Sequence, residues 1–486
     1  MNWQSSGGGA FAVIPAAQLG KLPDIYPLCR GHTAPVLDTA FSPFNDQLLV
    51  SASDEGTMGV WKVDDSIYDV LELNEKQREQ AGGIKDMSPV SKISSGSGRK
   101  VGQLLFHPTA NNVVAAASGD HIVRLYDIEA GQSKLEMKGF TDAMQSFDFD
   151  WTGSTLIATC RDRKLRTFDT RKGGDPVQIT EGHGGIKGAR VVWCGSLDRV
   201  ITTGFSKMSD RQMFLWDTTN LSKPLKSITL DSSSGIIMPF WSDNNICFLA
   251  GKGDGNIRYY EYENDELHYL TEYKSTEPQR GMTFIPRRML NTDENEIARA
   301  MKVTGNMVQP ISFLVPRRAD SFQSDIFPPA LSDIPALSSA EFFSGKTSSP
   351  NMINLEDKSG MAGQPTKPPV IKAEAAAPAT PAPASAAVST PAASSSPSSE
   401  KAAALPAPSR QLSANSASSA LPTPSRQLSS SSATSAAPAA SSSVSGSAGA
   451  GGTLAFLREN GSGASGSSSI APASGSNGSD SKVSRK

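Results

Sequence analysis

One short segment recurs five times in this chain, and its spacing restricts the folds that the chain can adopt. Each copy is an apolar strand that follows an acidic turn and ends near an aromatic residue. The aromatic residues are Trp61, Tyr126, Phe168, Trp216 and Tyr260, at intervals of 65, 42, 48 and 44 residues. Self-similarity with a period of roughly 40 to 50 residues indicates a structure built from repeated units.

An acidic residue stands six positions before each of these aromatic residues. The five acidic residues are Glu55, Asp120, Asp162, Asp210 and Asp254. A polar insertion at about residues 65–95 accounts for the longer first interval. Because the acidic residue recurs with every strand, we expect it to build a turn and not to act as a catalytic base.

A second marker keeps the same phase as the aromatic residues. Gly31–His32 and Gly182–His183 precede Trp61 and Trp216, by 29 and 33 residues counted from each His. Two short apolar segments separated by a turn lie between marker and aromatic residue, which is typical of strands in a meander. A unit of this length that begins with Gly-His and ends with Trp-Asp is the pattern of a WD repeat.

The flanks of the five repeats supply further strands. Residues 281–288, 297–305 and 311–318 fit a last blade, and residues 2–3 and 10–15 fit a first blade. Repeats of this kind stack their sheets radially around a channel. We therefore predict an all-β, seven-bladed WD-repeat propeller over residues 1–320, with the first and last blades incomplete.

The histidines of the repeats are predicted to be structural. In WD repeats the loop His, the Asp of the tight turn, a strand hydroxyl and the Trp form one hydrogen-bonded chain, which is stable when every member is paired. Here the chains would run from His32 to Ser51 or Ser53 and Trp61, and from His183 to Thr202 or Thr203 and Trp216.

Nothing in the sequence recommends an enzyme or a bound cofactor. The loop "GKGDGN" at 251–256 lacks the Lys-Ser/Thr ending of a phosphate-binding loop, no Gly-x-Ser-x-Gly motif occurs, and no His pair has metal-ligand spacing. The four cysteines, at 29, 160, 194 and 247, are far apart, as expected of buried thiols in a reducing compartment.

The charge and hydropathy of the chain also limit its partners. The net charge is −2, no run of 18 apolar residues occurs, and the N-terminus lacks the order of a signal peptide. We expect a cytoplasmic protein that neither binds nucleic acid nor inserts into a membrane.

From about residue 346 the sequence is mostly Ser, Ala, Pro and Gly, which predicts a disordered tail over 346–486. Two similar segments, "LPAPSRQLS" at 405–413 and "LPTPSRQLS" at 421–429, lie within it. Arg-x-x-Ser is the order that basophilic kinases favour, so Ser413 and Ser429 are candidate phosphorylation sites. Duplication within a low-complexity sequence is the alternative explanation.

Residues 2 to about 335 resemble the coronins, a family of actin-associated WD-repeat proteins. The resemblance is carried by residues 2–49, by "RKVGQLLFHPTANNVVAAASGDHIVRLYDI" at 99–128 and by "DSFQSDIFPPAL" at 320–331. It implies an extension at 321–345 that packs on the propeller, binding to filamentous actin, and a location at cortical actin structures. It also implies an influence on the branched-actin nucleating complex and cross-linking through a C-terminal coiled coil.

Two departures from the coronin pattern affect these expectations. Coronins usually have several dozen residues before the position of Asn2, including a strand that closes the ring, so we expect a truncated gene model or isoform with an open strand edge. The C-terminal residues show no heptad register. Self-association and action on the nucleating complex therefore do not follow.

Basic residues near the blade turns are candidates for contact with actin. Actin filaments are acidic, and exposed cations on one face would attract and hold them. The candidates are Arg99, Lys100, Arg124, Arg161, Arg163, Lys164 and Arg166, with Arg287–Arg288 and Arg317–Arg318 in addition. Simple solvation of charged turns is the alternative for each residue, and a WD-repeat scaffold for a non-actin complex is the alternative function.

Overall fold

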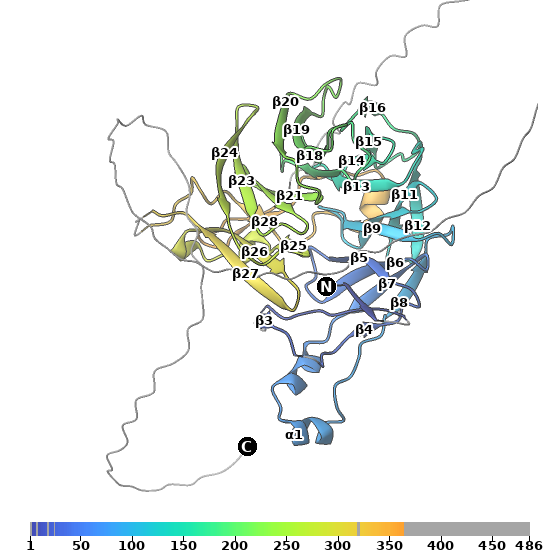
Figure 1. Cartoon of the computed structure of the whole chain (residues 1–486). Helices are drawn as coiled ribbons and strands as arrows, with labels where there is room; N and C mark the ends of the chain where they lie inside the picture. The colour runs from blue at the N-terminus through green and yellow to red at the C-terminus, as the bar shows by residue number, and fades with distance from the viewer. Residues whose placement is uncertain (1, 6–7, 17–18, 24, 318–320, 364–486) are drawn as a thin grey trace, which may run out of the picture. The chain divides into compact units, whose positions relative to one another are not determined.

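The computed structural model describes residues 2–5, 8–16, 19–23, 25–317 and 321–363, which belong to one compact unit. Within these residues, seven antiparallel sheets follow one another around a ring, and a small eighth sheet lies in the C-terminal segment (Figure 1). The predicted seven-bladed WD-repeat propeller is confirmed.

Five of the sheets contain four consecutive strands each. They are β5 (Val36–Phe41), β6 (Leu48–Ser53), β7 (Thr57–Lys62) and β8 (Ser91–Ser94); β9 (Val101–Phe106), β10 (Val113–Ser118), β11 (Ile122–Asp127) and β12 (Gln132–Met137); β13 (Met144–Phe149), β14 (Thr155–Cys160), β15 (Lys164–Asp169) and β16 (Gln178–Glu181); β17 (Arg190–Trp193), β18 (Arg199–Phe205), β19 (Arg211–Asp217) and β20 (Lys226–Asp231); and β21 (Ile237–Ser242), β22 (Ile246–Gly251), β23 (Ile257–Glu263) and β24 (Glu266–Tyr273).

The second strand of a blade is covered on both faces by neighbouring sheets. All six residues of β10, β14 and β22 are buried. Strands buried on both faces have continuous runs of small and apolar residues in place of a strict alternation. This explains the apolar sequences "VVAAAS" at 113–118 and "ICFLAG" at 246–251, which both form the second strand of a blade.

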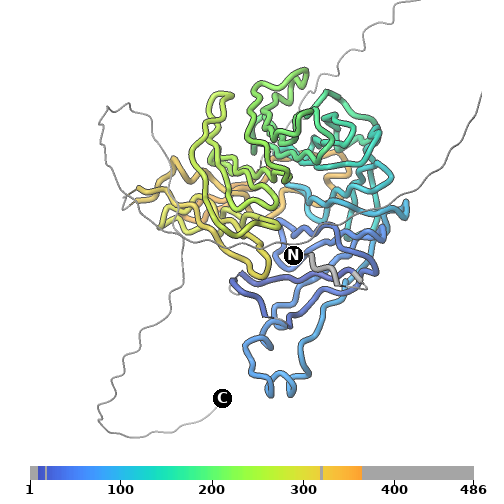
Figure 2. The backbone as a smooth tube through the Cα atoms, viewed as in Figure 1, coloured from blue at the N-terminus to red at the C-terminus, as the bar shows by residue number. Residues whose placement is uncertain are grey.

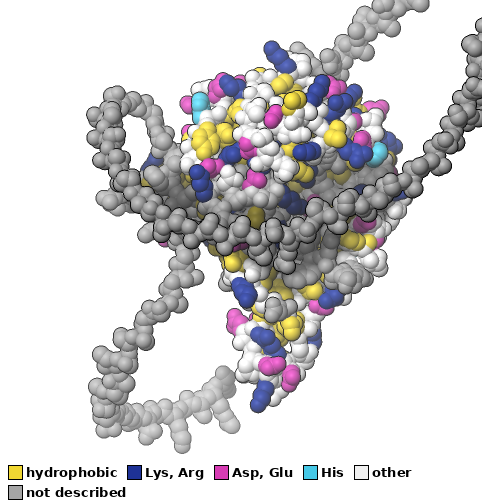
Figure 3. All heavy atoms as spheres, in the orientation of Figure 1, with side chains coloured by type: hydrophobic (Ala, Val, Ile, Leu, Met, Phe, Trp, Pro, Cys, Tyr) yellow, Lys and Arg dark blue, Asp and Glu magenta, His cyan; other side chains and the backbone are white. Residues whose placement is uncertain are grey.

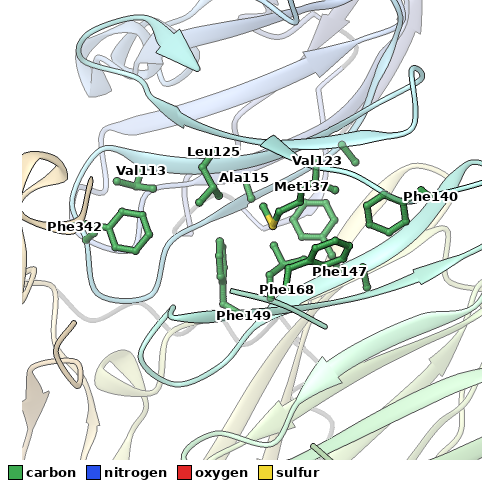
Figure 4. Close-up of a cluster of buried hydrophobic side chains, with 14 of the residues drawn as sticks. Val113, Ala115, Val123, Leu125, Met137, Phe140, Phe147, Phe149, Phe168 and Phe342 are labelled. Carbon is green, nitrogen blue, oxygen red and sulfur yellow. The ribbon is translucent and has the colours of Figure 1, made fainter. Parts of the chain in front are cut away.

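The core lies between adjacent sheets. In Figure 4, Val113, Ala115 and Leu125 of one sheet face Phe149 and Phe168 of the next. Phe342 of α2 (Ser339–Phe343) also joins this cluster, although it lies far along the chain from these strands. The ring is therefore held by apolar contact between blades and by a C-terminal segment that packs on them.

The inner edges of the sheets are joined by hydrogen bonds from side chains to backbone. Asp38 on β5 accepts the Leu104 N–H of the next sheet at 2.8 Å, and Asp148 on β13 accepts the Trp193 N–H at 2.8 Å. An edge strand has backbone groups that need partners. These carboxylates supply them across the blade boundary.

One short strand links the first and last sheets. The first has three strands, β1 (Asn2–Ser5), β2 (Gly8–Phe11) and β4 (Cys29–Arg30). The last combines β25 (Gly281–Phe284), β26 (Glu296–Val303) and β27 (Met307–Leu314) with β3 (Gly20–Lys21). Strand β3 makes this link, because it lies between β2 and β4 in the chain and pairs with Met307 and Val308 of β27. The sequence predicts that both blades are incomplete: among the described residues the first has only three strands, whereas the last gains β3 as a two-residue fourth strand.

The polar insertion after β7 covers the outer edge of the first sheet. It contains the 3₁₀ helix η1 (Asp65–Leu71) and α1 (Glu75–Gln80), which projects from the ring (Figures 1 and 2). At its base, the Tyr68 hydroxyl donates to the Val13 carbonyl at 2.9 Å, and Met87 forms a parallel bridge with Cys29. Tyr68 and Met87 are buried, so the insertion is also part of the core.

The C-terminal segment, residues 321–363, packs on the last sheet and on the β9–β12 and β13–β16 sheets. It includes β28 (Ala330–Leu331), β29 (Met352–Ile353) and β30 (Gly360–Met361). The loop between β25 and β26, which contains the 3₁₀ helices η2 (Arg287–Met289) and η3 (Thr292–Glu294), contacts this segment. The Arg287 guanidinium donates to the carbonyls of Pro328 and Pro329, at 2.8 and 3.2 Å.

This packing continues beyond residue 345, where composition placed the start of the tail. Leu355 is only 1% exposed and lies in a cluster with Phe327 and Phe313. The rest of the predicted tail, from residue 364 with Ser413 and Ser429, lies outside the described residues.

The carboxylates at the inner edges predict a dependence of stability on pH. Burial raises the pKa of Asp148 to about 7, whereas an aspartate in the unfolded chain has a pKa of about 4. The folded protein therefore binds this proton more tightly, and Asp148 favours folding more as the pH falls through 7. Relative to Asp148→Asn, the wild-type chain should gain ~1–2 kcal/mol of unfolding free energy between about pH 8 and about pH 5.5. Urea unfolding at both pH values measures this, and a constant difference between the two proteins would contradict it.

Candidate functional site

The loops and turns that carry the repeat markers lie on one face of the propeller. In an antiparallel four-stranded blade, the loop before the first strand and the turn between the second and third strands are at the same end. Backbone hydrogen bonds join the two, as from Gly119 N–H to Lys100 O and from Gly185 N–H to Phe205 O, both at 2.7 Å. We call this surface, formed by those loops and turns, the turn face.

The predicted chain from His32 to Trp61 is present in the β5–β8 sheet. Trp61 Nε1–H donates to Ser51 Oγ at 2.8 Å, and Ser51 Oγ lies 2.6 Å from His32 Nε2. His32 Nδ1 lies 2.8 Å from Glu55 Oε1. Ser51, and not Ser53, is therefore the hydroxyl partner, because Ser53 bonds to the carbonyls of Ala34 and Pro35.

The second chain is present in the β17–β20 sheet. Trp216 Nε1–H donates to Thr202 Oγ1 at 2.8 Å, and Thr202 Oγ1 lies 3.0 Å from His183 Nε2. Burial lowers the pKa of His183 to about 4, so the imidazole is neutral at physiological pH. Both histidines are held by the strand hydroxyl, but only His32 also contacts the carboxylate of its turn, because His183 Nδ1 has no hydrogen-bond partner among the described residues.

The β9–β12 and β13–β16 sheets have no His at the marker position, and in each a buried arginine takes the place of the hydrogen-bonded His–Trp chain. The sequence analysis did not predict these arginines. Arg166 binds both carboxylate oxygens of Asp162, at 3.0 and 2.5 Å, and lies over the ring of Phe140, which stands where two of the other repeats have His. Arg124 binds Ser118 and Asp120 at 2.7 Å.

Arg124 and Arg166 are therefore unsuited to contact a partner. They are only 8% and 2% exposed, and each guanidinium is bonded inside the fold. Their proposed role in actin contact is corrected to a structural one. A signal for this existed in the sequence, since Arg stands two residues before Tyr126, Phe168 and Tyr260.

The acidic residues of the turns are bonded inside the fold. Although burial opposes ionisation, hydrogen bonds from Arg166 and Thr141 hold the pKa of Asp162 below its usual range. Asp254 accepts from Arg211 at 2.7 Å, and Asp210 accepts from Ser206 Oγ at 3.0 Å. The carboxylates that the repeat requires are therefore committed to structural hydrogen bonds.

Several cations on the same face are exposed and form no ion pair with any described residue. Arg99 and Lys100 lie in one loop, and Arg163 lies at the tip of a turn, as the sequence predicted. Three more, which the sequence analysis missed, are Lys187, Lys207 and Lys252. They carry no repeat signal, because they lie on loops and turn tips whose exposure follows only from the fold.

The remaining predicted cations are paired. Arg161 binds Asp142 at 2.9 Å, and Lys164 lies 3.8 Å from Glu181. Arg287 and Arg288 lie near Asp243 and Asp46, Arg317 binds Asp325, and Arg318 is outside the described residues. Figure 3 shows cations and carboxylates interspersed over the face in view. Whether a given cation lacks a carboxylate partner therefore depends on its immediate neighbours and not on the net charge of the surface.

The backbone at Arg163 is in the left-handed region, with φ of +68°. The residue after the acidic one also has positive φ in two other turns, at Gly56 and His121, whereas in the remaining two turns the residue before the acidic one does, at Ser209 and Gly253. Glycine adopts this conformation without the steric cost that an arginine incurs. Arg163 is therefore a residue that the turn itself does not favour, which makes it a functional candidate.

Other kinds of site receive no support from the described residues. Among them, no group of three or more His, Cys, Asp or Glu side chains is placed to hold a metal ion. All four cysteines are free and buried. None of the helices in the described ranges has the length and apolar character needed to span a bilayer.

Comparison with known proteins identifies similar chains. The model of the WD domain, G-beta repeat, matches residues 25–62, and a second WD40 repeat model matches 308–350. A coronin-like protein of Schizosaccharomyces pombe is 50% identical over 73% of this chain and 57% of its own length, and one of Saccharomyces cerevisiae is 47% identical over 71% and 53%. The chain therefore spans little more than half the length of these two relatives.

Two further matches cover more of the related protein. Coronin-A of Dictyostelium discoideum is 41% identical over 73% of this chain and 76% of its own length. Among solved structures, the WD40 domain of Toxoplasma gondii coronin has a TM-score of 0.64 and 28% identity, over 76% of this chain and 89% of that domain.

Arg163 and Arg166 of the β13–β16 sheet should differ strongly in how their substitution affects stability. Arg166→Gln leaves Asp162 without its cationic partner in a largely buried site, and should lower the unfolding free energy by ~3 kcal/mol. Arg163→Gly should stay within ~1 kcal/mol of wild type, because relief of the left-handed conformation offsets the greater freedom of the unfolded chain. Urea unfolding of both variants measures this. Equal losses of stability would refute the assignment of these two roles.

Proposed function

The chain belongs to the coronin family of actin-associated WD-repeat proteins, and on that premise we propose that its propeller binds actin filaments through the turn face. Binding there would organise actin filaments in the cytoplasm, at cortical actin structures. Coronins and other WD-repeat propellers are generally non-enzymatic, and the proposal concerns binding alone.

The observation that supports this proposal most strongly is the unequal fate of the two charges on the turn face. The turn carboxylates are held by Arg166, Arg211 and other internal donors. The cations at the loop and turn tips, among them Arg99 and Arg163, are exposed without a carboxylate partner in the described chain. Two carboxylates of this face, Asp54 and Glu277, are also exposed, but the six exposed cations without a carboxylate partner among the described residues outnumber them. This surface therefore presents an excess of positive charge to an incoming acidic surface, although the chain as a whole has a net charge of −2.

Attraction of this kind is local and screened. Exposed charges further apart than about 10 Å at 0.1 M salt interact little, so binding through the turn face should weaken as salt rises. Complementary charge also speeds encounter more than it deepens affinity. The cations are thus expected to set the salt dependence of filament binding.

The proposal does not extend to filament cross-linking or to the branched-actin nucleating complex. The resemblance assigns those activities to a coiled coil, and the longest described α-helix, α1, has six residues. A WD-repeat scaffold for a non-actin complex is the competing function, and filament binding distinguishes the two.

Removal of three free cations should weaken filament binding. We expect the variant Arg99→Gln, Lys100→Gln, Arg163→Gly to raise the Kd for actin filaments ~10-fold at about 50 mM salt, and to bind with a shallower salt dependence than wild type. Co-sedimentation of the full chain with filaments measures both. The matched control, Lys62→Gln, Lys76→Gln, Lys85→Gln, removes three exposed cations in or next to the insertion and should bind like wild type.

Either of two outcomes would contradict the proposal. A wild-type chain that fails to sediment with filaments even at low salt would favour the scaffold alternative. Equal weakening by the two triple variants would show that total charge matters, and not its position on the turn face.

A further inference from the structure

The blade formed by β17–β20 carries the two most exposed large apolar side chains in the described chain. Met208 is 84% exposed and Ile186 is 74% exposed. Both lie on the turn face, Ile186 in the loop before β17 and Met208 in the turn between β18 and β19. Single exposed apolar residues are ordinary on a protein surface, but two on adjoining loops of one face form a feature that needs an explanation.

The two loops are packed against each other. Gly185 N–H donates to Phe205 O at 2.7 Å, and a Cβ at Gly184 would stand 3.0 Å from the Lys207 side chain. The ammonium of Lys187 lies 4.8 Å from the centre of the Phe205 ring. One Ile, one Met and two Lys side chains are therefore grouped on these two loops. We call Ile186, Lys187, Lys207 and Met208 the apolar crest.

The turn that carries Met208 is held by its own hydrogen bonds. Ser206 N–H donates to Asp210 O at 2.8 Å, and Ser206 Oγ accepts from the N–H groups of Met208 and Asp210, both at 3.1 Å. Ser209 adopts a left-handed φ of +69°, as the tip of this turn requires. The exposure of Met208 is thus a property of a defined turn. A preformed loop loses little conformational entropy when it binds.

We propose that the apolar crest inserts into an apolar recess bordered by carboxylates on the surface of the actin filament. The inference rests on the proposed function, and assigns the apolar part of the contact. Lys187 and Lys207 flank the two apolar side chains, so a recess that accepts the crest must present negative charge at its border. Buried apolar contacts at the centre of an interface carry most of its affinity, whereas surrounding charges carry less.

An anionic membrane is the other surface that apolar side chains beside lysines can fit. The crest carries no Trp, Phe or Leu, the residues that anchor protein segments at a lipid interface. The free cations of the turn face are also spread over several blades, from Arg99 to Lys252, and not gathered at the crest. These observations favour a protein partner, and the membrane becomes an outcome of the test.

The test separates apolar from charged contacts by their response to salt. The variant Ile186→Ser, Met208→Ser should raise the Kd for actin filaments ~10-fold at both low and high salt, with the slope of log Kd against log salt unchanged, because loss of apolar contact is not screened. The matched control is Ile179→Ser, Met289→Ser. It makes the same two substitutions at exposed positions outside the turn face, 46% and 52% exposed, and should bind like wild type. Thermal unfolding should show that both variants fold.

The outcomes distinguish this inference from the proposed function. If wild type binds filaments and the crest variant binds equally well, the crest inference fails and the proposed function stands. If wild type does not bind filaments at low salt, both fail. Sedimentation of the full chain with phosphatidylserine vesicles, abolished in the crest variant alone, would overturn the filament assignment in favour of a lipid surface.

Discussion

The pairing of each turn carboxylate with a donor inside the fold is the interaction on which the rest of this structure depends. A buried or half-buried carboxylate must be paired, and this chain supplies His32, Arg124, Arg166 and Arg211 for that purpose. The pairing fixes the turns and the loops that rest on them. It also leaves few carboxylates free on the turn face, so that the exposed cations there outnumber the exposed carboxylates Asp54 and Glu277.

The sequence predicts those parts of the molecule that repeat. Period, acidic turns and aromatic strand ends specify the blades, and the Gly-His and Trp markers specify the chain from His32 to Trp61. Features that occur once carry no such signal. The strand β3 has two residues, the packed segment beyond residue 345 depends on single side chains such as Leu355, and the burial of Arg124 follows from strand register.

Charge and apolar area have different tasks on the turn face. The free cations act over a distance and are weakened by salt, so they govern encounter and orientation. The apolar crest acts only on contact, and its contribution does not depend on salt. A surface with both elements on rigid turns can discriminate a partner that has carboxylates around an apolar recess from one that is merely acidic.

Electron cryomicroscopy of actin filaments decorated with the full chain tests the central claim most directly. The account predicts that the propeller contacts the filament with its turn face, with Arg99, Arg163 and Met208 within contact distance of actin. Density that places the opposite face against the filament, with Met289 and Arg288 at the contact, would contradict it.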